Sequence, residues 1–106
     1  MAFVRKKVGS YKWPVKIETP LDGGSFEIQR MTVEFKRITQ TQIEKFKDNK
    51  ELLNEVIVGW SEYKDEKGVE IPFSTEELGY LVEDTTFLRA AGMAFFESLS
   101  GAKPGN

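Results

Sequence analysis

Cysteine and histidine are both absent from this chain of 106 residues. Without cysteine the chain can form neither a disulfide nor a thiolate metal site, which fits a reducing compartment. Without histidine it lacks the commonest general base and the commonest transition-metal ligand. The two absences exclude Ser-His-Asp, Cys-His and zinc-hydrolase chemistry, so an enzyme built on this sequence would depend on carboxylate, lysine or tyrosine side chains.

Long apolar runs are also missing. The longest contain only a few residues, far short of the roughly 20 that cross a bilayer, and no apolar stretch follows the charged N-terminus. Apolar residues nevertheless make up 40% of the chain and aromatic residues 12%, enough for a buried core. We therefore expect one folded domain over residues 1–106, with no membrane partner.

The net charge is only −2, but it is unevenly distributed. Residues 1–53 carry a charge of +4 and residues 54–106 a charge of −6. Opposite patches of this kind can orient a protein on a partner or on a copy of itself, although ordinary surface charge explains the pattern equally well. Because the basic residues are scattered and the isoelectric point is about 5.3, we expect no nucleic-acid partner.

The first half of the chain has the pattern of β-strands. Between residues 11 and 19, Trp13, Val15 and Ile17 alternate with polar residues, which indicates a strand with one apolar face. Pro14 has no N–H to donate, so this is either an edge strand or a strand that begins near Pro14. A turn at 22–24 precedes a second strand over 26–36.

The apolar alternation of the second strand changes phase. Phe26 and Ile28 occupy even positions, whereas Met31, Val33 and Phe35 occupy odd ones. A β-bulge near residues 29–31 would absorb the extra residue, and two strands joined by a tight bend would give the same pattern.

Residues 39–100 have helical periodicity. Thr41 and Glu44 suggest a capping box, Asp48-Asn49 a break, and the apolar positions of 50–58 a helix that Gly59 would end. After a polar loop over 61–72, Ser74 and Glu77 have the pattern of a second capping box, Asp84 or Thr85 that of an N-cap, and Gly101 that of a C-cap. We predict an α+β fold: an N-terminal β-hairpin or small antiparallel sheet (11–36), then a bundle of three to four helices (39–100), with a flexible arm (1–9) and a mobile tail (101–106).

The carboxylates of residues 62–84 give no specific sign of chemistry. They match a calcium loop only loosely, and a solvated acidic loop explains them without desolvating any carboxylate. We therefore predict no catalytic, cofactor or metal site. The competing hypothesis is a carboxylate enzyme with Glu70 or Asp84 as base, which requires a cleft with strongly shifted pKa values.

Two adjacent aromatic residues lie in the last predicted helix. Phe95 falls on the apolar stripe formed with Phe87, Leu88, Ala91, Ala94 and Leu99, whereas Phe96 is about 100° further round the helix. One of the pair should therefore be partly exposed. Phe96 either packs on a neighbouring element or serves as an aromatic anchor for a partner.

The second half carries several short motifs in a definite order. These are Val58-Gly59-Trp60, Asp65-x-x-Gly68, Ile71-Pro72-Phe73-Ser74 with Glu77-Leu78, and Ala94-Phe95-Phe96-Glu97 before Gly101. In order and spacing they resemble the tail assembly chaperones of lambda-type, long-tailed bacteriophages and prophages. The resemblance covers about residues 14–103 and is strongest over 56–78.

The resemblance implies a chaperone of tail assembly that acts in the host bacterial cytoplasm and is not retained in the mature virion. It implies binding of the tape-measure protein, recruitment of the major tail-tube protein, and a longer form made by ribosomal frameshift. For such a client, we expect a groove between the C-terminal helices, with candidate contacts from Trp60, Asp65, Glu66, Phe73, Phe95 and Phe96. The alternative is a small structural virion protein, such as a tail-completion or head-tail joining component.

Overall fold

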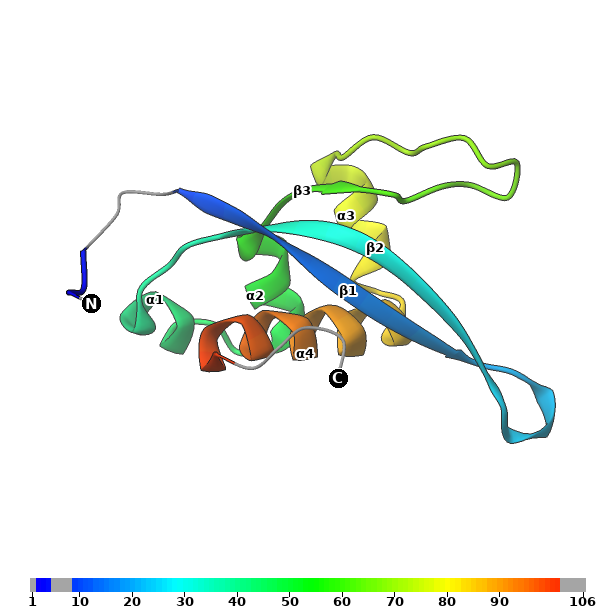
Figure 1. The fold of residues 1–106 in the computed structure, drawn as a ribbon, viewed down its shortest axis with the longest axis horizontal. Helices are drawn as coiled ribbons and strands as arrows, with labels where there is room; N and C mark the ends of the chain where they lie inside the picture. The colour runs from blue at the N-terminus through cyan, green and yellow to red at the C-terminus, as the bar shows by residue number, and fades with distance from the viewer. Residues whose placement is uncertain (1, 5–8, 102–106) are drawn as a thin grey trace.

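The computed structural model describes residues 2–4 and 9–101 of the chain. Within these residues the chain forms a three-stranded antiparallel sheet, of strand order β1-β2-β3, and four α-helices that pack on one face of the sheet (Figure 1). The predicted α+β arrangement is therefore confirmed. Most of the predicted arm (1–9) and of the predicted tail (101–106) lies outside the described residues.

A long β-hairpin begins the sheet. Strand β1 (Ser10–Pro20) pairs with β2 (Phe26–Lys36) along its whole length, and the short 3₁₀ turn η1 (Asp22–Gly24) joins them. Gly23 and Gly24 have φ angles of 85° and 87°, which explains why the turn needs glycine at these positions. Because β1 is an edge strand, Pro14 costs the sheet no ladder hydrogen bond to a further strand.

The bulge predicted near residues 29–31 is wrong. The β1–β2 register is unbroken from Ser10 opposite Lys36 to Pro20 opposite Phe26. Met31 is buried, as its odd position requires, whereas Phe26 and Ile28 are simply exposed. The change of phase therefore marks the point at which the hairpin extends beyond the core. The sheet does contain an irregularity, but it lies between Glu34 and Phe35 on the side of β2 that pairs with β3.

Two short helices follow the hairpin. Helix α1 (Gln40–Glu44) begins with a capping box formed by Thr39 and Gln42, so the box predicted at Thr41 and Glu44 was placed two residues too late. Helix α2 (Asn49–Val56) begins where the break was predicted, and its N-cap Asp48 accepts a hydrogen bond from the Glu51 N–H at 2.9 Å.

Strand β3 (Ile57–Ser61) lies where the sequence predicted the end of a helix. Helix α2 stops at Val56, and Gly59 is a strand residue rather than a C-cap, so residues 39–100 are not wholly helical. Consecutive β-branched residues at 56–58 favour the strand. At Gly59 a Cβ would lie 3.0 Å from the Glu34 Oε1 atom, so the Glu34 side chain would have to shift to admit a larger residue.

A loop over residues 62–71 leads from β3 to the last two helices and projects from the body of the protein (Figure 1). Ser74 caps α3 (Thr75–Leu81) and Asp84 caps α4 (Thr85–Ser100), both as predicted. Helix α4 ends at Gly101, which has a φ of 79°.

The core fills the space between the sheet and the helices. Odd-numbered residues of β1 and β2 contribute Val15, Met31, Val33 and Phe35. From the other side come residues of α2, β3, α3 with its C-cap, and α4, including Leu53, Ile57, Leu78, Val82, Phe87, Ala91 and Phe95. Helix α2 approaches α4 closely at Gly92, where a Cβ would lie 3.1 Å from the Asn49 Nδ2 atom. This arrangement leaves the opposite side of α4 free of the core.

Candidate partner-binding surface

Helix α4 carries a row of exposed apolar side chains. Met93 is 54% exposed, Phe96 43% and Leu99 52%, and the spacing of three residues keeps them on neighbouring parts of one surface, the α4 face. The same helix buries Phe87, Ala91, Ala94 and Phe95 on its other side. Helix α4 is therefore apolar on both sides, although only one of them meets the core.

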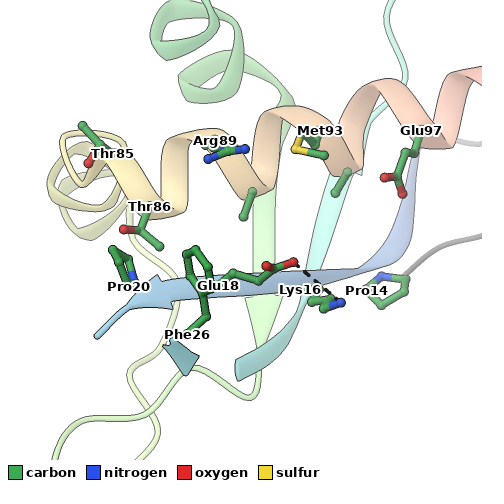
Figure 2. A pocket seen from close by; sticks show the side chains of 12 residues that line it. Pro14, Lys16, Glu18, Pro20, Phe26, Thr85, Thr86, Arg89, Met93 and Glu97 are labelled. Carbon is green, nitrogen blue, oxygen red and sulfur yellow. Dashed lines mark ion pairs between the residues drawn. The ribbon is translucent and has the colours of Figure 1, made fainter. Parts of the chain in front are cut away.

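A groove runs between α4 and the edge strand β1, with a volume of about 370 Å³ (Figure 2). Ala90, Ala94 and Met93 form its helix side, and Pro14, Pro20 and Phe26 its strand side. Charged groups lie along it as well: Lys16 and Glu18 form an ion pair at 3.6 Å, and Arg89 and Glu97 lie on α4. The groove is thus lined by apolar and polar groups in similar measure, with a balanced set of charges.

A second, shallower groove lies on the other side of the same helix surface. It shares Arg89, Met93 and Glu97 with the first groove and continues past Phe96 to Asn49 at the beginning of α2. Met93 therefore stands between two grooves. Together they form an amphipathic surface with Met93 and Phe96 at its centre and one charge of each sign beside them, the kind of surface that suits an amphipathic helix.

The structure separates the two adjacent phenylalanines as the helical spacing predicted. Phe95 is 1% exposed and packs edge-on against Phe35, with ring centroids 5.2 Å apart, so it has no surface to offer a partner. The prediction of Phe95 as a partner contact is therefore corrected. Phe96 is partly exposed on the α4 face, and the centroid of its ring lies 5.5 Å from that of Phe95.

Trp60 and Phe73 come together, but away from the α4 face. Their ring centroids are 4.8 Å apart, and Tyr63 lies 5.3 Å from Trp60. The Trp60 Nε1–H also donates to the Ile71 carbonyl at 2.9 Å. Trp60 and Phe73 line neither groove at α4, and their contacts hold the base of the 62–71 loop together.

Tyr63 belongs to the same aromatic cluster and connects the loop to α3. Its hydroxyl donates to the Glu77 Oε1 atom at 2.8 Å. Burial, followed by this hydrogen bond, raises the pKa of Tyr63 to about 12. The Glu77 side chain therefore binds Tyr63 of the loop and does not complete a capping box with Ser74.

Asp65 and Glu66 lie at the exposed tip of the loop. The Asp65 Oδ1 atom accepts hydrogen bonds from the backbone N–H groups of Lys67, at 2.8 Å, and Val69, at 3.0 Å. Asp65 therefore shapes the turn that Gly68 completes with its φ of 81°. Neither acidic residue lines a groove at α4, and the 62–71 loop that carries them projects from the body of the protein (Figure 1).

The candidate bases of the enzyme hypothesis both have structural partners. Glu70 accepts a hydrogen bond from the Glu62 N–H at 3.2 Å, and Asp84 accepts from the first turn of α4. Within residues 2–4 and 9–101, no group of three or more acidic side chains is arranged to hold a metal ion. The same residues contain no helix long and apolar enough to span a membrane.

Sequence reasoning missed several residues of the surface. Met93, Arg89, Phe26 and Pro14 line the grooves, and Leu99, predicted on the buried stripe, is half exposed. One signal was available, because Met93 is an apolar residue that lies off the predicted stripe of its helix.

A scan against protein-family models and searches of curated proteins and of solved structures found nothing that matches this chain. What the chain does must therefore be inferred from its own surfaces and from the order of its sequence motifs.

Proposed function

We propose that this protein is a phage tail assembly chaperone that binds an amphipathic helix of the tape-measure protein on the α4 face. The observation that carries the proposal is the half-exposed apolar row of Met93, Phe96 and Leu99, in which Met93 lines both grooves and Phe96 lines the second. The ordered motifs of residues 56–78 support it from the sequence. In this proposal the protein also helps to recruit tail-tube subunits, has no catalytic activity, and leaves before the virion is complete.

A helical client explains the chemistry of the surface. A tape-measure protein is a long, largely helical chain that would expose apolar stripes until the tail tube surrounds it. Anchors spaced by three or four residues can mask such a stripe, as in other helix-in-groove complexes. Arg89 and Glu97, one turn on either side of Met93, would fix the direction of the bound helix.

The exposed area predicts reversible binding. Full burial of a large apolar side chain contributes roughly 1.5–3 kcal/mol, and about half of each side chain in the row is still exposed. The three side chains together then contribute on the order of 3 kcal/mol, before the cost of immobilising the client. Several copies along one client would be needed for firm retention, and each contact could be released as the tube forms.

The longer form expected for this family is compatible with the fold. Helix α4 has completed its core contacts before Gly101, whose left-handed conformation ends the helix. A chain that continued after this residue would not need to enter the core, so the frameshifted form would carry the same α4 face.

The test is co-expression with the tape-measure protein of the same tail gene cluster, with its solubility and co-purification measured. We expect the chaperone to keep the client soluble. A Met93→Ala/Phe96→Ala variant should reduce co-purification by at least tenfold while its melting temperature stays within a few degrees. The matched control is Tyr80→Ala, which removes a 65%-exposed aromatic side chain from α3 and should retain the client.

Two outcomes would contradict the proposal. If the double variant and the Tyr80 control retain the client equally, the α4 face is not the binding surface. If the client stays insoluble while this protein forms closed rings and remains in purified particles, the protein is a structural virion component of the tail-completion or head-tail joining type.

A further inference from the structure

Strand β2 is longer than its pairing with β3. On the β1 side every residue from Phe26 to Lys36 has a partner, but β3 pairs only with the segment from Thr32 to Phe35. No strand of the described residues pairs with the other side of residues 26–31, the distal edge. Figure 1 shows this end of the hairpin running past β3 and curving away from it.

The β1 edge of the sheet is protected against pairing, whereas the distal edge is not. Strand β1 carries Pro14 and Pro20 and the lysines Lys12 and Lys16, and α4 lies beside it. Proline and lysine on an edge strand are the usual means by which proteins prevent strand addition. The distal edge has the sequence Phe-Glu-Ile-Gln-Arg-Met, with no proline or lysine.

The exposed side chains of the distal edge favour β-structure. Phe26 is 56% exposed and Ile28 is 52% exposed, and neither belongs to the buried core. A β-branched and an aromatic residue on a strand with one unpaired edge form a template for another strand. The remaining question is which strand fits this edge.

We propose that a second copy of this chain pairs with it, distal edge to distal edge, as an antiparallel two-fold dimer. A two-fold axis perpendicular to the sheet keeps each side chain on its own face, so residues of equal parity lie opposite one another. The register centred on Ile28 sets that residue against itself and sets Phe26 against Arg30 of the second copy. On the other face Glu27 lies opposite Gln29.

This register is self-complementary. The isoleucine pair joins two β-branched side chains, and each arginine lies beside an aromatic ring, where a cation–π contact can form. No two like charges face each other. The register centred on Gln29 would instead set Ile28 against Arg30 and Glu27 against Met31, and would lose both favourable pairs.

The pairing should be weak and dependent on concentration. Six residues of a strand span only about 20 Å, and their contact falls below the ~1,000 Å² expected of a stable interface. It uses the backbone edge of β2 rather than the α4 face. The two surfaces share Phe26, which also lines the groove at α4, but dimer formation can be measured without a client.

Single cysteines test the register directly, because the chain has none of its own. Directly opposed residues of antiparallel strands have Cα atoms about 4.5–5.5 Å apart, within disulfide range. Under mild oxidation Ile28→Cys should form a disulfide dimer at least tenfold faster than Leu21→Cys, a control of similar exposure at the turn. A mixture of Phe26→Cys and Arg30→Cys chains should cross-link faster than either alone. Equal rates for Ile28→Cys and Leu21→Cys would overturn the proposal.

Sedimentation of chains that carry no introduced cysteine measures the monomer–dimer equilibrium directly. Ile28→Lys places two lysines face to face and should shift the monomer–dimer equilibrium at least tenfold towards monomer, whereas Leu21→Lys should leave it unchanged. Circular dichroism checks that each variant is folded, which the exposure of both side chains favours. A wild-type chain that stays monomeric at millimolar concentration would also refute the dimer.

Discussion

The neighbouring residues Phe95 and Phe96 should differ sharply in their contribution to stability. Phe95 is 1% exposed, and its ring packs against that of Phe35 with the ring centroids 5.2 Å apart. Phe95→Ala therefore leaves a cavity in the centre of the core. Replacement of a buried phenylalanine by alanine costs about 3–5 kcal/mol. Phe96 is 43% exposed, and its smaller buried area corresponds to about 1 kcal/mol.

Urea denaturation followed by the fluorescence of the two tryptophans measures this difference. We expect both variants to keep the m-value of the wild type and Phe95→Ala to lose about 2–4 kcal/mol more than Phe96→Ala. The melting temperature should fall by about 4–8 °C for each kcal/mol lost in a domain of this size. Equal losses would mean that Phe96 is a core residue, and the α4 face could then no longer be treated as a binding surface.

Two further predictions concern Tyr63 and Asp48. The pKa of Tyr63 in the folded protein, about 12, lies above the 10.0 of an exposed tyrosine, so its stabilising effect is complete below pH 10 and is lost as the pH rises towards 12. Tyr63→Phe should therefore show a smaller loss of unfolding free energy between pH 10 and 12 than the wild type, and parallel curves would contradict the assignment. Asp48→Ala removes the N-cap of α2 and should cost about 1 kcal/mol in urea denaturation. Asp22→Ala, at a carboxylate that caps no helix, should cost less than 0.5 kcal/mol, roughly the limit for surface changes, and an equal cost would refute the cap.

The elements that could be predicted are those set by neighbouring residues. The alternation around Val15, the glycine turn, the break at Asp48-Asn49 and the N-caps at Ser74 and Asp84 are local signals, and all appear in the structure. Strand β3 was missed because its identity depends on pairing with β2, far away in the sequence. An apolar run that follows a helix can continue that helix until another strand is present to pair with it.

The candidate surface was predictable only in part. The exposure of one phenylalanine followed from the 100° between neighbouring positions of a helix. The groove did not, because Pro14 and Phe26 come from two strands and Met93 from a helix. Trp60 and Phe73 were predicted as partner contacts, which stays a prediction, and their contact with one another could not be foreseen from the sequence.

The position of β3 between α2 and α3 has a consequence for the order in which the chain folds. The β1–β2 hairpin closes over a short turn, and hairpins of this kind form in about 1–10 μs. The pairing of Phe35 with Ile57 spans the whole α1–α2 segment, so its loop-closure entropy is larger and its formation later. During synthesis the hairpin can therefore form early. Its core face remains exposed to solvent until β3 and α4 have left the ribosome.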